Sequence, residues 1–382
     1  MSMNEILKAA LFTPTRRGWG LPLLAWGAPG TAKSNIIEEL ARRWGMPCEV
    51  LSPGERGEGA FGCVPVPEEG MIAYPAPDWT SKFCKAGRGL VFVDELTTAA
   101  PALQPPMLGL VLEKRIGGTS LPGGVRMLAA ANPVEEAAAG YDLPPPLANR
   151  LGHITWDPGG VDEWTDWLMA VGETASDSTS DAEAEEHRVE AAWAGAFSRA
   201  KGTTAAFVRR RPELLHKMPK VGDPAIGRAW PSRRSWEFAT RALASVQVHG
   251  LDDTHRDEFL AAFVGSGAAG ELATFLADLD LPDPADLLDG KVKFQHDARR
   301  LDRTFAVLTS CAALVTPTGA AKRKDRAAAM WDILAPITES AADVTVPSAR
   351  AMVRSGLIES KAARSCLQKL SPVLSAAGVG SR

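Results

Sequence analysis

Gly27-Ala28-Pro29-Gly30-Thr31-Ala32-Lys33-Ser34 lies between the apolar run Leu21–Trp26 and a segment whose apolar residues have helical spacing. In a glycine-rich loop between a strand and a helix, backbone N–H groups point inward and bind phosphate oxygens. We expect Lys33 to reach the β- and γ-phosphates of a nucleotide and the Ser34 hydroxyl to bind Mg²⁺. The stretch therefore predicts an α/β fold built around a phosphate loop.

The loop departs from the common pattern at one position. Ala32 stands where a glycine usually precedes the lysine, and its methyl group lies near the phosphates. A plain glycine-rich turn before a helix is the alternative interpretation. Residues further along the chain favour the phosphate loop, because they supply the partners that such a loop needs.

Two adjacent carboxylates follow a strand of the buried type, Leu90-Val91-Phe92-Val93-Asp94-Glu95. At the carboxyl end of a parallel strand, Asp94 can hold Mg²⁺ through water. Glu95 can orient and polarise the attacking water. A strand that ends in solvated acids is the alternative, and the phosphate loop earlier in the chain makes it less favourable.

A polar amide ends the following strand, in Ala131-Asn132-Pro133. Asn132 can form hydrogen bonds with both the attacking water and the γ-phosphate. Asparagine also precedes proline in many ordinary turns, so both interpretations of Asn132 stay open at this point.

The first 158 residues alternate short apolar runs with helical patterns, which predicts a parallel sheet flanked by helices. Beyond Asp157-Pro158-Gly159-Gly160 the apolar residues recur three or four apart, and we expect helices. An acidic segment, Glu173–Glu190, is expected to be an exposed loop. We predict an αβα nucleotide-binding core over 1–158, a helical lid over 159–250 and a helical C-terminal region over 251–382. The five expected strands are Leu21–Trp26, Cys48–Ser52, Gly89–Asp94, Val125–Ala131 and His153–Trp156.

Composition excludes several classes of protein. The chain has 382 residues, 45% of them hydrophobic and 23% charged, with a net charge of −4. A nearly neutral chain has no global field for polyanions. Five cysteines without a C-x-x-C pair predict neither a disulfide framework nor a zinc site. Without a signal-peptide pattern or a long apolar run, we expect a cytoplasmic protein and no membrane segment.

Taken in order, these motifs resemble those of the AAA+ ATPases, and within them the MoxR group, whose phosphate loop often has alanine before the lysine. Asp94-Glu95 matches the second nucleotide motif of the family, and Asn132 matches its polar sensor. Leu147-Ala148-Asn149-Arg150 resembles the segment with the arginine finger, so Arg150 is expected to reach a neighbouring subunit's γ-phosphate.

The lid of the family carries a second sensor, and Ala229–Trp236 resembles the segment that opens its helix. Arg234 aligns with the sensor arginine, and Arg233 is the alternative. The resemblance covers about 1–158 strongly and weakens beyond about 245. The C-terminal region therefore inherits no residue-level function.

Two insertions also fit the MoxR pattern. Gly57–Gly70 resembles the loop inserted in the second helix, and Arg115–Arg126 resembles the hairpin before the polar sensor. The second could equally be a simple surface hairpin. The resemblance implies that both loops face the opening of a ring and move with hydrolysis. Phe61 is the residue expected to touch substrate.

The resemblance implies an ATPase that uses ATP and Mg²⁺, assembles into a homo-oligomer (a ring of six) and remodels a partner protein. MoxR-like ATPases typically act on proteins with a von Willebrand A domain. This chain has no Asp-x-Ser-x-Ser run, so such a partner would be a separate polypeptide.

Two other functions stay open. Arg199–Arg234 holds ten lysines and arginines against only Glu213 and Asp223, so a nucleic-acid motor or loader is one alternative. An assembly scaffold switched by ATP is the other. We expect the basic stretch to face a nucleotide and a neighbouring subunit rather than nucleic acid.

Overall fold

The computed structural model describes residues 2–62, 64–133, 141–157, 159–170 and 181–376. The chain forms two compact units, which are described separately below. The first unit contains residues 1–190 and 216–269, and the second contains residues 191–215 and 270–382. The sequence-based division at 158 and 250 stays a prediction.

The first unit is built on a five-stranded parallel sheet with strand order β11-β3-β10-β7-β4. Its central strands are apolar runs buried on both faces, as a parallel sheet between helices requires. The five predicted strands and the predicted fold class are confirmed. The strands are β3 (Leu23–Trp26), β4 (Cys48–Leu51), β7 (Arg88–Val93), β10 (Gly124–Ala131) and β11 (Gly152–Thr155).

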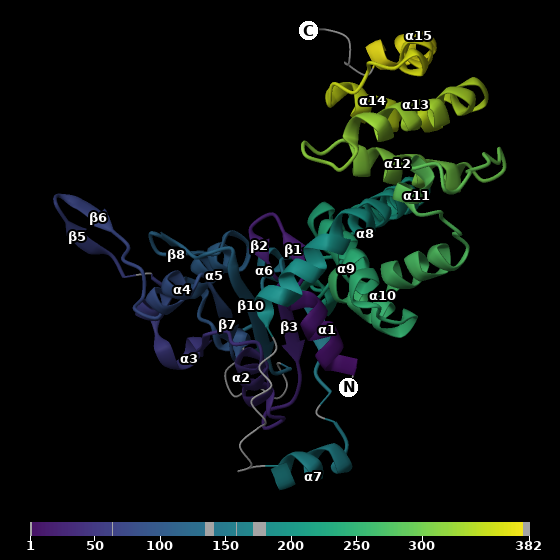
Figure 1. Cartoon of the computed structure of the whole chain (residues 1–382). Coiled ribbons are helices and arrows are strands. Elements are labelled where there is room, and N and C mark those ends of the chain that lie inside the picture. The colour runs from purple at the N-terminus through teal and green to yellow at the C-terminus, as the bar shows by residue number, and fades with distance from the viewer. Residues whose placement is uncertain (1, 63, 134–140, 158, 171–180, 377–382) are drawn as a thin grey trace. The chain divides into compact units, whose positions relative to one another are not determined.

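Helices pack around this sheet, as Figure 1 shows, and bury a continuous apolar core. The helix that follows β3 lies against β4 and β7 and buries Ile37, Leu40 and Ala41. The helices of this part are α1 (Ser2–Leu11), α2 (Lys33–Arg43), α3 (Pro53–Arg56), α4 (Thr80–Ala86), α5 (Gln104–Glu113) and α6 (Pro145–Ala148).

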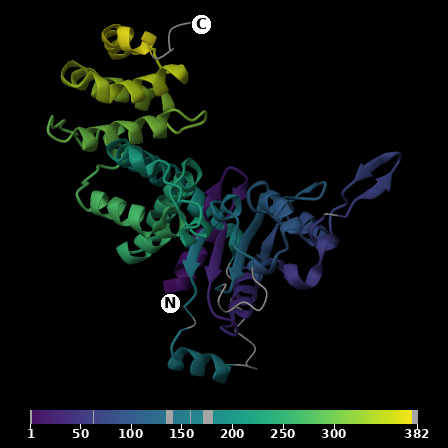
Figure 2. The ribbon, with the colours of Figure 1, turned by 180° about the vertical axis from the view of Figure 1, so that it is seen from behind.

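The first unit also contains short two-stranded β-hairpins. Strands β1 (Pro14–Thr15) and β2 (Gly18–Trp19) form one, and β8 (Arg115–Ile116) and β9 (Thr119–Ser120) form another. The third, of β5 (Val66–Glu68) and β6 (Met71–Ala73), projects away from the sheet in Figures 1 and 2.

The prediction for Phe61 is wrong. Phe61 ends a short 3₁₀ helix, η1 (Glu58–Phe61), and is completely buried in the same apolar core as Trp79 and Ile116. Among the described residues of the predicted Gly57–Gly70 loop, only Phe61 and Gly62 are buried, whereas residues 57–59 and 64–70 are exposed. A phenylalanine in a glycine-rich stretch looks exposed in the sequence, whereas its apolar area favours burial.

The remaining helices of the first unit include α9, which packs on α1. The predicted acidic loop Glu173–Glu190 is wrong over its second half, where α8 begins at Ala182; residues 171–180 lie outside the described residues. Acidic residues in the first turn of α8 suit the positive end of the helix dipole. These helices are α7 (Val161–Ala170), α8 (Ala182–Arg210), α9 (Arg233–His249) and α10 (Asp253–Ala277), of which α8 and α10 continue into the second unit.

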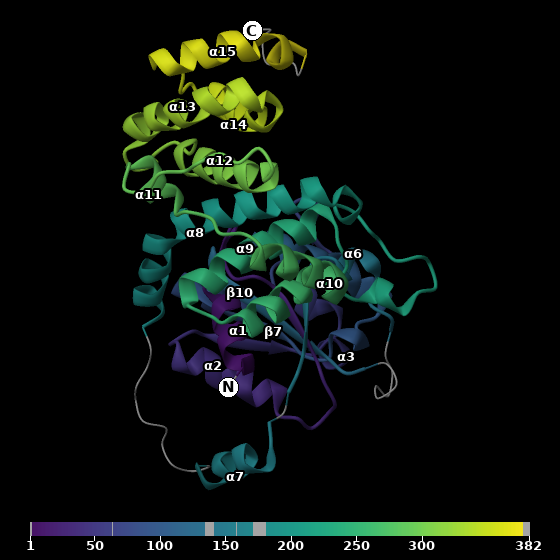
Figure 3. The same ribbon diagram turned by 90° about the vertical axis from the view of Figure 1, so that its right-hand side faces the viewer.

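The second unit is helical, and Figure 3 shows its C-terminal helices stacked in successive layers. Trp331 is nearly fully buried there, and its Nε1 donates to the Leu357 carbonyl oxygen at 2.6 Å. Its further helices are α11 (Pro284–Leu288), α12 (Leu301–Val315), α13 (Arg323–Ser340), α14 (Ala342–Arg354) and α15 (Lys361–Ala376).

Among the described residues, one helix, α10, has the length and apolar composition of a membrane span. Half of its apolar window is buried inside the protein, and Gly265 interrupts it with a φ of 77°. Both features are those of a core helix, so α10 is weak support for a membrane segment.

Candidate nucleotide site

Strand register brings the predicted site residues to one edge of the sheet. Trp26 of β3 pairs with Ala131 of β10, and Ala129 pairs with Val93 of β7. The three strands therefore end side by side, and the chain continues from them into the phosphate loop, Asn132 and Asp94. Ligands of parallel α/β sheets bind outside these carboxyl ends.

The phosphate loop has a defined conformation. Gly30 (φ 76°) and Ala32 (φ 59°) both adopt left-handed backbone, and Ala32 stands directly before α2. A Cβ on Gly27 would come 2.7 Å from Cβ of Trp156, so only glycine fits there. Nε1 of Trp156 donates to the Thr31 carbonyl oxygen at 3.1 Å, and Thr31 Oγ1 donates to the Ala28 carbonyl oxygen at 2.8 Å. Ala32 itself is exposed, so its methyl group is tolerated.

Lys33 is buried and turned toward the loop. Its Nζ donates to the carbonyl oxygens of Gly27 at 2.9 Å and Ala28 at 2.8 Å, and to Asn132 Oδ1 at 3.1 Å. Carbonyl and amide oxygens are weaker partners for an ammonium group than a phosphate is. A bound phosphate can therefore replace these oxygens as the partner of Nζ, and because the oxygens are neutral no charged group loses its partner.

Ser34 and Asp94 meet as a pair of oxygen donors. Ser34 Oγ donates to Asp94 Oδ2, and Asp94 Oδ1 accepts the backbone N–H of Glu95 at 2.9 Å. Mg²⁺ prefers oxygen ligands and usually takes only one or two protein carboxylates beside phosphates and water. This pair fits that requirement. Among the described residues no group of three or more His, Cys, Asp or Glu forms a separate metal site.

Glu95 has an unusual backbone. Its φ is 53°, in the left-handed region, and its side chain is exposed beside the end of β7. The Glu95 carbonyl oxygen accepts a hydrogen bond from Thr98 Oγ1 at 2.8 Å. A strained backbone at an exposed carboxylate is typical of a functional position.

Arg150 and Arg234 lie close enough for their charges to interact. Burial and then the charge of Arg234 lower the pKa of Arg150. Nε of Arg150 is buried without a hydrogen-bond partner among the described residues, while Nη1 donates to the Pro146 carbonyl oxygen at 2.6 Å. Two like charges held together favour an anion between them. Arg233, the alternative sensor, is also exposed.

The sequence alone does not identify a cluster formed by Trp26, His153 and Arg228. Trp26 Nε1 donates to His153 Nδ1 at 2.9 Å, so the His153 proton lies on Nε2, which donates to the Ala148 carbonyl oxygen at 3.0 Å. The Arg228 guanidinium carbon lies 3.5 Å from the centroid of a Trp26 ring. No motif marks these residues, because their partners are distant in the sequence.

Two observations decide the architecture. The phosphate loop follows β3, the carboxylate pair follows β7 and the amide follows β10, and β3 lies between β11 and β10 in the sheet. The fold is that of the P-loop AAA+ ATPases.

No family model and no curated protein matches the chain. Among solved structures, one described as a "putative ATPase from Cytophaga hutchinsonii ATCC 33406" is similar, with 13% sequence identity and a TM-score of 0.45. The similarity covers 73% of this chain and 88% of that one.

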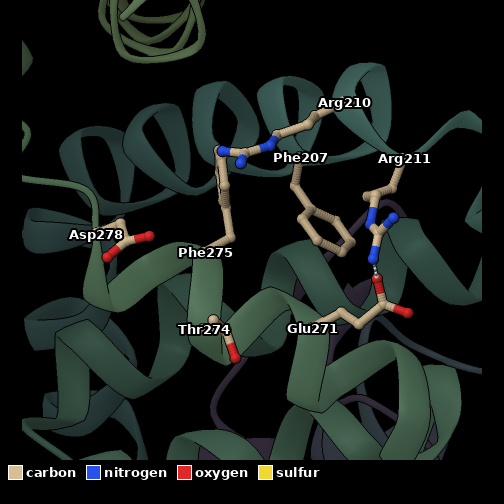
Figure 4. A pocket seen from close by; sticks show the side chains of 7 residues that line it. All are labelled: Phe207, Arg210, Arg211, Glu271, Thr274, Phe275 and Asp278. Carbon is tan, nitrogen blue, oxygen red and sulfur yellow. Dashed lines mark ion pairs between the residues drawn. The ribbon is translucent and has the colours of Figure 1, made fainter.

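The basic stretch at the end of α8 lines a cavity of about 420 Å³ in the second unit (Figure 4). Its arginines have acidic partners: Arg211 pairs with Glu271 at 2.5 Å and Arg210 with Asp302 at 3.3 Å. Arg199 likewise pairs with Asp283. Three of the ten basic residues in Arg199–Arg234 are therefore paired with acids.

Proposed function

We propose that this protein is an ATPase of the MoxR group that binds ATP with Mg²⁺ and hydrolyses it to ADP and phosphate. The observation that carries the proposal is the meeting of Lys33, Ser34, Asp94 and Asn132 at one edge of the sheet. These four side chains lie on segments that follow the ends of β3, β7 and β10. Together they supply a cation, two metal-binding oxygens and an amide, which is what phosphoryl transfer requires.

Each residue of the site has a distinct task in this proposal. The loop N–H groups and Lys33 hold the β- and γ-phosphates. Ser34 and Asp94 hold Mg²⁺, which neutralises charge on the phosphate oxygens when bound. Glu95 accepts a proton from the attacking water and orients it in line with the bond to the leaving ADP. Asn132 exchanges its contact with Lys33 for one with the γ-phosphate.

We propose that the site is completed by a second copy of the chain, in a ring of six. Arg150 and Arg234 lie together without an acidic ion-pair partner among the described residues, and the γ-phosphate of a neighbour's nucleotide would neutralise both. This arrangement assigns Arg234 to the neighbour's nucleotide rather than to its own. A planar guanidinium suits the task because it stays protonated and binds phosphate oxygens bidentately.

The β5–β6 hairpin is the proposed contact for a protein client. Its apolar side chains are unusually exposed, at 71% for Met71 and 70% for Ile72. An isolated two-stranded hairpin gains little stability in water, so such a surface fits a partner better than it fits solvent. The client class we propose is a separate protein with a von Willebrand A domain, in the cytoplasm.

Turnover of Glu95→Gln tests this function. The variant should bind ATP with unchanged affinity and lose turnover by about 10³-fold, because the amide cannot accept the proton of water. Glu58→Gln, a carboxylate of η1 outside the site, is the control and should keep wild-type turnover. Equal turnover of wild type and Glu95→Gln would remove Glu95 from its role.

Nucleic-acid binding is tested with the same protein. The pairing of Arg199, Arg210 and Arg211 with acids argues against it. We expect no binding of single- or double-stranded DNA at 50 mM salt and no stimulation of turnover. Salt-sensitive binding that raises turnover would instead support a motor or loader.

A further inference from the structure

Asn149 joins two segments that are far apart in the sequence. The residue is 5% exposed, and both ends of its amide have partners at the start of α9 or just before it. Nδ2 donates to the Trp230 carbonyl oxygen at 3.2 Å, and Oδ1 accepts from Ser232 Oγ at 2.6 Å. A buried amide with both ends satisfied fixes the relative position of the segments that it connects.

The two connected segments are those that carry the paired arginines. Arg150 follows Asn149 directly, and Ser232 is the N-cap of α9, with Arg234 in the first turn. The charges of Arg150 and Arg234 oppose this proximity, and partial burial further disfavours the charged form of Arg150. Some other interaction must therefore hold the segments together, and the Asn149 amide supplies it.

Helix capping does not explain Asn149. The N-terminus of α9 is already closed by its own residues, since Ser232 Oγ accepts from the Ser235 N–H at 3.1 Å and Ser235 Oγ accepts from the Ser232 N–H at 2.8 Å. This reciprocal pair satisfies the N–H groups of Ser232 and Ser235 without a contact from Asn149. The contact from Asn149 is additional, and its effect is to set the distance between α6 and α9.

We infer that Asn149 is a positioning residue that fastens Arg150 to the first turn of α9, so that Arg150 and Arg234 act as one two-arginine site for the terminal phosphate of a nucleotide held by a neighbouring copy. The inference rests on the proposed ATPase function. It adds a residue that touches no nucleotide and the coupling of two arginines into a single site.

Kinetics of Asn149→Ala and Asn149→Ala/Arg150→Ala test the inference. Asn149→Ala should lower kcat about tenfold and leave the Kd for ATP, measured in the Glu95→Gln background, within about twofold. In the Arg150→Ala background the same change should have no further effect, because the site is already broken. A full, additive tenfold loss in that background would overturn the coupling.

Mixing of subunits separates positioning from general damage. Asn149→Ala subunits keep an intact phosphate loop, so Lys33→Ala subunits, whose arginines are intact, should restore activity to the mixture. No restoration at any ratio would show that Asn149→Ala damages its own nucleotide site, and would overturn the inference.

Ser245→Ala is the matched control. Ser245 lies on α9, is fully buried and donates to the Ala9 carbonyl oxygen at 3.0 Å, not to Asn149. It should lower the melting temperature about as much as Asn149→Ala and leave kcat unchanged. If both variants lose kcat equally, the effect is one of stability and the inference fails. Absence of ATP turnover in the wild type would instead refute the proposed function itself.

Discussion

Single contacts set the shape of the phosphate loop, and Gly27 is the clearest case. A Cβ on Gly27 would meet Cβ of Trp156 at 2.7 Å, and Trp156 also holds the Thr31 carbonyl oxygen. We predict that Gly27→Ala displaces Trp156, costs about 1–3 kcal/mol of stability and weakens ATP binding more than tenfold. Isothermal titration and urea unfolding measure both effects.

The control for Gly27→Ala is Gly195→Ala. A Cβ there meets nothing within 4 Å, and the position lies inside α8. Alanine should therefore stabilise the helix by up to about 1 kcal/mol. Unaltered ATP affinity in Gly27→Ala would contradict the role that we give to the close approach of Gly27 and Trp156.

His153 makes the stability of the first unit depend on pH. Burial, with the nearby Arg228 charge, lowers its pKa to about 4, whereas an unfolded histidine titrates near 6.5. As the pH falls below 6.5 the unfolded chain takes up the proton first, so stability is lost between pH 6.5 and 4. His249, whose pKa burial also lowers to about 4, acts in the same direction.

We predict that His153→Gln reduces the slope of the unfolding free energy against pH. The reduction should correspond to the uptake of at most one proton on unfolding. Urea unfolding of wild type and variant from pH 4.5 to 7.5 gives the two slopes. The wild type should lose up to roughly 3 kcal/mol per histidine over the range. Identical slopes in the two proteins would show that His153 is not the titrating group.

At the scale of elements, the sequence predicts strands better than it predicts surfaces. Continuous apolar runs such as Leu90–Val93 give the sheet within one or two residues, because burial on both faces leaves no polar position. Phe61 and the start of α8 were mispredicted, since glycine- and acid-rich stretches look exposed. Asn149 could not be identified at all, because its partners lie more than 80 residues away.

The β5–β6 hairpin contributes little to the folded core. Val66, Met71 and Ile72 are all more than 40% exposed, so they bury little apolar area. We predict that replacing residues 66–73 with a glycine–serine linker changes the melting temperature by less than about 2 °C and leaves ATP affinity intact. Scanning calorimetry and titration check this. A large loss of stability would mean that the hairpin packs on the protein.

At the scale of the whole molecule, two units with separate cores should respond to different perturbations. In the proposed function ATP binds to the first unit, so a hundredfold excess of ATP over its Kd should stabilise that unit by about 2.7 kcal/mol and raise its melting temperature. Leu334→Ala removes a fully buried side chain from the second unit and should cost about 2–5 kcal/mol there.

Calorimetry of these proteins tests whether the cores are independent. With ATP and Mg²⁺ present, Leu334→Ala should lower the melting temperature of the second unit and leave that of the first unit unchanged. Its Kd for ATP should equal that of the wild type. However, α8 and α10 continue from one unit into the other. If these helices transmit unfolding, one transition will appear that both perturbations shift together. That result would mean that the stability of the C-terminal helices affects nucleotide binding through α8 and α10.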